Sequence, residues 1–69
     1  MKISDIATRL RQGEKLCISF DGWMDDAGHQ KWTSPLSDAQ MFAYWNHKVI
    51  HVREEEGTLY CIIEAEVVR

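Results

Sequence analysis

The stretch KVIHVREEEGTLYCIIEAEVV, residues 48–68, decides the fold. Two runs rich in β-branched and apolar residues flank the turn Glu55-Glu56-Gly57, and glycine is a residue type that favours tight turns. The pattern therefore predicts two strands, Lys48–Glu54 and Thr58–Val68, that pair as an antiparallel hairpin.

The two faces of the second strand differ in polarity. One face has no polar interruption and consists of Leu59, Cys61, Ile63, Ala65 and Val67; the other consists of Tyr60, Ile62, Glu64 and Glu66. We expect the first face in the core, because a slip of one residue would bury two glutamates. Tyr60 and Ile62 then lie on the face of the sheet that should be exposed to solvent. This second face is a sheet edge, a dimer seam or an ordinary solvent face.

The N-terminal part predicts a helix followed by a strand. Ser4 is a suitable N-cap, apolar residues follow at helical spacing, and Gly13 is a residue that ends helices, so we expect a helix at about residues 4–12. In Lys15–Phe20 apolar and polar residues alternate, which predicts a half-buried strand. A short strand at Gln30–Thr33 is expected to return beside it.

A second helix has the clearest local signal. Ser37 and Gln40 form a capping box, and Leu36 and Met41 form the hydrophobic staple that often accompanies it. The helix is expected to end at Asn46 or His47. Its core face is expected to consist of Met41, Phe42 and Trp45, which would bury Phe42 and Trp45.

Together these elements predict a single small α+β domain over residues 1–69. An antiparallel sheet of three or four strands would carry two short helices on one face. Cys17 and Cys61 then lie on opposite sides of the sheet, so we expect free thiols rather than a disulfide.

Charge and composition narrow the possible partners. The chain has 11 acidic and 8 basic residues, a formal net charge of −3, and no basic stripe, which makes nucleic acid an unlikely partner. No apolar run approaches the roughly 20 residues that span a bilayer. We therefore expect a cytoplasmic protein with no membrane partner.

The residues that could carry chemistry are few. The sequence contains no catalytic motif and no glycine-rich phosphate loop, so we expect a protein that is not an enzyme and needs no cofactor. Asp21, Asp25 and Asp26 share a glycine-containing segment, which is either a polar turn or a site for a metal or small ligand. A regulator that uses this Asp21–Asp26 loop is the alternative to a protein that acts by binding another protein.

The expected binding residues combine aromatic, adaptable and acidic side chains. Trp23 is either an exposed anchor for a partner or a lid that folds back over the core. The acidic residues suit a partner with a basic surface, and a homodimer is a further possibility. The candidates are Trp23, Met24, Asp25, Asp26, Tyr44, Glu54, Glu55, Glu56, Tyr60 and Ile62. If the acidic segments Asp21–Asp26 and Glu54–Glu56 lie on one side of the molecule, their combined negative field could mimic nucleic acid.

Both ends of the chain resemble small accessory proteins of bacteriophages and prophages. The resemblance rests on MKISDIATRLRQGEKLCISF at residues 1–20 and KVIHVREEEGTLYCIIEAE at residues 48–66. It implies a small non-enzymatic protein that acts by binding, in some cases by inhibiting a host defence complex as anti-CRISPR proteins do. It assigns no functional residue, since these stretches contain no functional motif.

Overall fold

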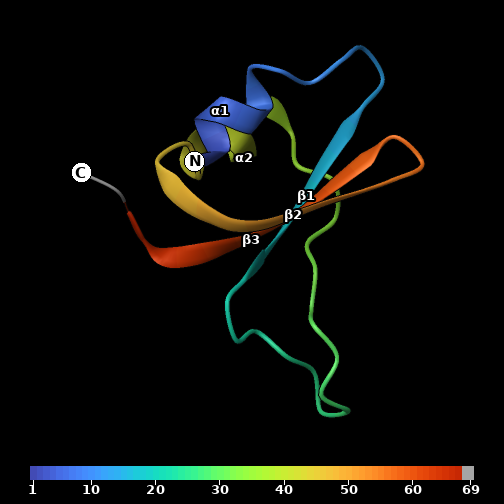
Figure 1. Cartoon of the computed structure of the whole chain (residues 1–69), viewed down its shortest axis with the longest axis vertical. Coiled ribbons are helices and arrows are strands. Elements are labelled where there is room, and N and C mark those ends of the chain that lie inside the picture. The colour runs from blue at the N-terminus through green and yellow to red at the C-terminus, as the bar shows by residue number, and fades with distance from the viewer. Residues whose placement is uncertain (68–69) are drawn as a thin grey trace.

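A computed structural model describes the backbone of residues 1–67 and the side chains of residues 1–65. Within that range the chain forms two short helices and three strands (Figure 1). In chain order they are α1 (Ile3–Ala7), β1 (Lys15–Phe20), α2 (Asp38–Ala43), β2 (His47–Glu55) and β3 (Thr58–Val67). The α+β class expected from the sequence is confirmed. The end of the predicted hairpin at Val68 lies outside the described residues.

The sheet is mixed, which corrects the expectation of an antiparallel one. Its order is β1-β3-β2, so β3 is the central strand. β2 and β3 form the predicted antiparallel hairpin, whereas β1 pairs parallel to β3, with Lys15 opposite Thr58 and Phe20 opposite Ile63. The central position suits β3 because Tyr60 and Ile62 make it partly apolar on its second face as well.

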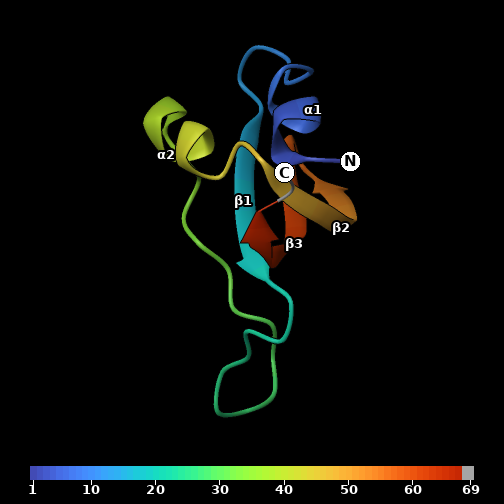
Figure 2. The ribbon, with the colours of Figure 1, turned by 90° about the vertical axis from the view of Figure 1, so that its left-hand side faces the viewer.

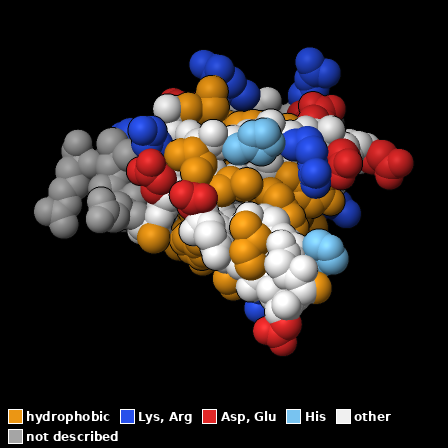
Figure 3. Space-filling view, turned by 60° about the horizontal axis from the view of Figure 1, so that its bottom comes forward, with side chains coloured by type: hydrophobic (Ala, Val, Ile, Leu, Met, Phe, Trp, Pro, Cys, Tyr) orange, Lys and Arg blue, Asp and Glu red, His pale blue; other side chains and the backbone are white. Residues whose placement is uncertain are grey.

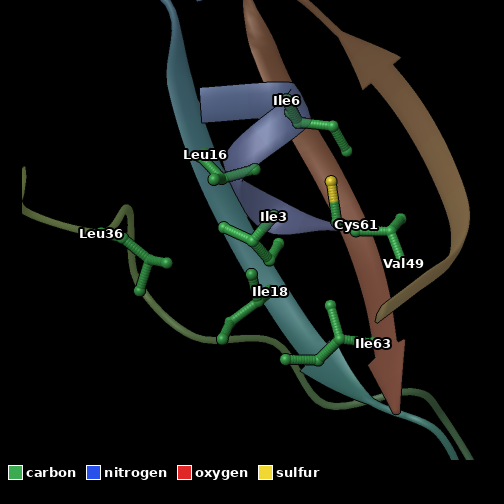
Figure 4. Close-up of a cluster of buried hydrophobic side chains, with 8 residues drawn as sticks. All are labelled: Ile3, Ile6, Leu16, Ile18, Leu36, Val49, Cys61 and Ile63. Carbon is green, nitrogen blue, oxygen red and sulfur yellow. The ribbon is translucent and has the colours of Figure 1, made fainter. Parts of the chain in front are cut away.

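The predicted core face of β3 is confirmed at its centre. Cys61 and Ile63 are fully buried, and Leu16 and Ile18 of β1 lie beside them (Figure 4). The core cluster is Ile3, Ile6, Leu16, Ile18, Leu36, Val49, Cys61 and Ile63. Ala65, expected on this face, is exposed. The side chains of Glu66 and Val67 lie outside the described residues.

An irregularity in β2 places two of its apolar residues on the core face of the sheet. The register of β2 against β3 shifts between Val49 and His51, so Val49 lies opposite Ile63 and Val52 opposite Cys61. Plain alternation would put Val49 and Val52 on different faces, and a β-bulge re-aims side chains in this way. Val49 is buried, whereas Val52 on the same face and Ile50 each remain 42% exposed.

α1 is shorter than the predicted helix and begins earlier. It covers Ile3–Ala7, and its N-cap is Lys2, whose backbone N–H donates to the Asp5 carboxylate at 2.8 Å. Thr8 ends it and donates its hydroxyl hydrogen to the Ser4 carbonyl at 2.8 Å, a local bond that competes with helix continuation. Gly13 has a φ of +86° and serves a later turn rather than the helix end.

α2 confirms the capping box and corrects the predicted core face. The Gln40 N–H donates to the Ser37 hydroxyl at 3.2 Å, and the Gln40 side chain accepts from the Ser37 N–H at 2.9 Å. Because the helix ends at Ala43, Trp45 does not continue the helical face assumed for it. Met41 and Tyr44 pack against the core instead, Trp45 is half-buried, and Phe42 is 72% exposed.

β1 has the predicted bounds, but it is buried on both faces rather than one. Cys17 and Ser19 are buried as well as Leu16 and Ile18. The segment that follows the long loop runs along the outer edge of β1. There the Thr33 N–H donates to the Ile18 carbonyl at 2.9 Å, and the Leu36 N–H donates to the Leu16 carbonyl at 2.8 Å. The strand expected at Gln30–Thr33 does not form. Gln30 instead makes an isolated bridge with Met24, and the segment that follows it pairs with β1 through the hydrogen bonds above.

The core assignment predicts a sharp contrast between two variants. Ile18→Ala should lower the free energy of unfolding by about 2–5 kcal/mol, because it opens a cavity beside Cys61. Phe42→Ala should cost about 1 kcal/mol or less, since an exposed ring leaves no cavity. Urea unfolding measures both changes, and equal losses in the two variants would contradict this core.

Candidate functional site

An exposed aromatic pair lies between the two helices. The rings of Phe42 and Trp45 stack with centroids 5.4 Å apart and an interplanar angle of 26°. They line a shallow groove of about 310 Å³, which we call the aromatic groove; it is formed by Ala7, Thr8, Asp38, Met41, Phe42 and Trp45. A stacked aromatic pair that stays at the surface of so small a domain is a candidate contact for a partner.

The groove is held in place from both sides. The capping box at Ser37 fixes the start of α2, and Met41 packs its side chain against the core. The Ser4 N–H of α1 donates to the Trp45 carbonyl at 3.0 Å, which ties the first helix to the turn after the second. These contacts form the groove before any partner binds. Sequence reasoning missed it because Phe42 and Trp45 were assigned to the core.

Trp23, predicted as either an exposed anchor or a lid, is half-buried. Its ring meets the Phe20 ring edge-on at 6.1 Å, and the Lys31 ammonium lies 5.2 Å from the ring centroid. These contacts therefore fit the interpretation of Trp23 as a lid better than that of an exposed anchor. Met24 beside it is 48% exposed.

The carboxylate of Asp25 serves the loop itself. Its Oδ1 accepts the backbone N–H groups of Ala27 and His29, each at 2.9 Å, which is the geometry of a polar turn. Asp26 beside it is exposed. Among the described side chains, those of residues 1–65, no group of three or more His, Cys, Asp and Glu is placed to hold a metal ion.

The two acidic segments lie at different ends of the molecule, so the condition for a common negative field is not met. The Lys15 N–H donates to the Gly57 carbonyl at 3.0 Å, so the hairpin turn lies at the start of β1. The acidic loop begins at Asp21, after β1 has run its six residues or about 20 Å. Figures 1 and 2 both show the loop tip far below the hairpin. The structure thus does not support nucleic-acid mimicry by a shared field.

The hairpin end has its own polar cavity. Glu55, Glu56, Thr58 and Tyr60 line about 410 Å³ of open space. Glu55 pairs with Arg53 at 3.4 Å, and the Arg53 guanidinium also lies 5.1 Å from the centroid of the Tyr60 ring. Glu54 is exposed beside this pair. Because Glu55 is exposed to solvent and its carboxylate pairs with Arg53, this cavity resembles a solvated turn more than a catalytic cleft.

The remaining predicted binding residues are largely structural. Tyr44 packs against the core and meets the Phe20 ring at 6.0 Å. Tyr60 meets Trp32 edge-on at 5.2 Å, and Ile62 is half-buried on the same face. Both lie on the central strand, so they do not form the sheet edge considered for them; the edge strands are β1 and β2. Figure 3 views the side away from the helices, where hydrophobic side chains gather between charged groups.

The two thiols are free, buried and on opposite faces of the sheet, as the alternation predicted. Burial raises the pKa of the Cys61 thiol from its ordinary value of 9.0 to about 11, and the nearby Cys17 acts in the same direction. Burial also raises the pKa of Cys17, against the opposing charge of Lys15. A nucleophilic cysteine needs a lowered pKa, so neither thiol has the environment of one.

Comparisons with protein-family models, with curated proteins and with solved structures each return no match. Within the described chain, neither helix has the length and apolar composition that crossing a membrane requires.

The long loop depends on one amide, which gives a testable prediction. The Gln30 side-chain NH2 lies within hydrogen-bond distance of the fully buried Ser19 hydroxyl and of the Phe20 and Trp23 carbonyls, which share its two hydrogens. Gln30→Ala should lower the free energy of unfolding by about 1–3 kcal/mol, because these acceptors lose their donor. His29→Ala at the exposed neighbouring position is the control. Equal thermal melting of the two variants would contradict the anchoring role.

The buried thiol predicts a loss of stability in alkali. A folded-state pKa of about 11 for Cys61, above its ordinary 9.0, means that the folded protein holds this proton more tightly. The resulting stability is present below pH 9 and is lost as the pH rises from 9 towards 11. Urea unfolding across this range should show a shallower decline for Cys61→Ala than for the natural protein. Parallel declines would refute the assignment.

Proposed function

We propose that the protein is a small non-enzymatic protein-binding module and that the aromatic groove is its binding surface. The observation that carries this proposal is the 72% exposure of Phe42, stacked on Trp45 outside the core. A free domain gains little from a large ring held in water. Burial of such a ring against a partner adds about 25 cal/mol for each Å² of apolar surface removed from water.

The chemistry of the groove limits the partner. Its walls are mostly apolar, from Ala7, Met41 and the two rings, and Asp38 supplies a carboxylate at the border. This combination suits a protein segment that inserts one apolar side chain and places a Lys or Arg beside Asp38. Aromatic anchors with a polar rim are the usual arrangement of residues that dominate binding energy.

The resemblance to phage and prophage accessory proteins suggests the class of partner. We propose that the chain acts as an accessory protein or inhibitor that occupies a surface of a host complex, such as a defence complex. A regulator that binds a metal or small ligand through the Asp21–Asp26 loop is less well supported, because Asp25 already accepts two backbone N–H groups.

A capture experiment with matched variants tests this function. The natural protein, Phe42→Ser and Met24→Ser are each immobilised and exposed to a bacterial lysate, and retained proteins are quantified by mass spectrometry. We expect a stoichiometric partner that Met24→Ser retains and Phe42→Ser loses. Calorimetry with the purified partner should show binding at least about 30-fold weaker for Phe42→Ser, as for a residue that dominates an interface.

Melting temperatures of the variants serve as the control, and Phe42→Ser should melt close to the natural protein. A partner that survives Phe42→Ser but is lost in Met24→Ser would assign binding to the acidic loop instead. Calcium, magnesium or zinc binding that disappears in an Asp25→Asn, Asp26→Asn double variant would favour the regulator.

A further inference from the structure

Asp21 is the only aspartate of the chain that precedes a glycine. In such a pair the main-chain nitrogen of the glycine can attack the aspartate side chain, because glycine has no Cβ to hinder its approach. Asp21 and Gly22 are both exposed, and a Cβ placed on Gly22 would meet no other atom within 4 Å. Among the described residues, the Gly22 N–H donates to no protein acceptor, so this nitrogen is free to react.

The reaction of this pair forms a succinimide ring and needs only water as a partner. A bond forms between the Gly22 nitrogen and Cγ of Asp21, and the bond from Cγ to one carboxyl oxygen breaks. That oxygen leaves as water, with the hydrogen of the amide and the hydrogen of the protonated carboxyl group. A second water molecule then opens the ring. Attack at Cγ restores aspartate, whereas attack at the main-chain carbonyl carbon of Asp21 leaves isoaspartate.

The other aspartates are less suited to this reaction. Asp25 Oδ1 already accepts two backbone N–H groups. The nitrogen that would attack Asp26 belongs to Ala27, whose N–H donates to Asp25 at 2.9 Å. Asp5 and Asp38 lie in α1 and α2, where the helix fixes the main chain. Asp21 is therefore the aspartate at which we expect the ring to form.

The native turn holds the two reacting atoms of this pair apart. The Trp23 N–H donates to the Phe20 carbonyl at 2.9 Å, and Gly22 has a φ of +82°. Among the described non-glycine residues only Glu56 has a positive φ, so that of Asp21 is negative. These values define a type II turn, in which the ψ of the second residue, here Asp21, is about +120°. This angle directs the Gly22 nitrogen away from the Asp21 side chain, so the turn must open before the ring can close.

Gln30 holds both ends of this turn. Its side-chain nitrogen lies 2.9 Å from the Phe20 carbonyl oxygen and 3.1 Å from the Trp23 carbonyl oxygen. The Trp23 carbonyl also accepts the Lys31 N–H at 2.8 Å. Local opening of an exposed segment is limited by a small number of such contacts. Loss of the Gln30 amide should therefore raise the fraction of molecules in which the turn is open.

We propose that the Asp21–Gly22 bond is a site of spontaneous conversion of aspartate to isoaspartate, and that Gln30 sets its rate by holding the turn closed. The product carries one extra carbon atom in the main chain between β1 and the loop. This displaces the hydrogen bond from the Asp21 N–H to the Ile63 carbonyl, and the loop separates from the end of β1. The aromatic groove lies between the helices, so the modification is independent of the proposed function.

Incubation of the folded protein in heavy-oxygen water tests the site. Ring opening places a heavy oxygen on residue 21, and mass spectrometry of peptides prepared in ordinary water locates it. We expect the label and isoaspartate at Asp21 and at no other aspartate. Asp21→Glu keeps the carboxylate but would need a larger ring, so it should lose the label. Label at another aspartate in place of Asp21, or none at all, would refute the site.

The rate of labelling tests the control by the turn. Gln30→Ala should take up label at least about fivefold faster, as expected when acceptors at both ends of the turn lose a donor. His29→Ala should react at the natural rate, and circular dichroism confirms that both variants are folded. The natural protein unfolded in urea should also react faster than the folded protein, which tests the turn without a substitution.

Two results would overturn this control. One is a Gln30→Ala rate equal to that of the natural protein, and the other is an equal rate with and without urea. The isoaspartate form, separated by ion-exchange chromatography, should melt at a lower temperature than the unmodified protein. An unchanged melting temperature would contradict the displacement of the loop.

Discussion

The placement of β3 between β1 and β2 is the constraint on which the rest of the structure depends. Its buried residues Cys61 and Ile63 face the core between Ile18 on one side and Val49 on the other. Ile3 and Ile6 of α1 close over this layer. Since few side chains are fully buried, each contributes a large share of a stability that is marginal in any domain of this size. Loss of the register of β3 would expose the buried residues of α1, β1 and β2.

The small core also explains why large aromatic side chains are found outside it. The fully buried apolar places are taken by isoleucine, leucine and cysteine, which fit between one thin sheet and α1, and the fully buried Ser19 lies on the other face of the sheet. Trp32 and Tyr60 cover the second face of the sheet instead, with Arg53 above both rings. Phe42 and Trp45 have no such covering role, which distinguishes them from the other aromatic residues and makes their groove the best candidate for an interface.

Features that depend on neighbouring residues could be predicted from the sequence. The capping box at Ser37, the bounds of β1 and the turn at Gly57 all follow from residues a few positions apart. The parallel partner of β1 could not be predicted this way, because hydrophobic alternation shows which side of a strand is buried and not which strand lies next to it. The groove was missed for a related reason. The face of α2 that meets the core changes once the helix ends at Ala43, and no residue near Ala43 marks that end in the sequence.

The central position of the last strand has a consequence for how the protein is made. A ribosome synthesises the residues of α1, β1, α2 and β2 before those of β3, yet β1 and β2 are not neighbours in the sheet. Until residues 58–67 emerge, neither strand has its partner, and the apolar residues of both remain in water. The nascent chain therefore has no stable intermediate sheet and folds in one step, only after residues 58–67 have left the ribosome. Until then its unpaired strands are open to chaperones, and a chain that stops before residue 58 cannot complete this sheet.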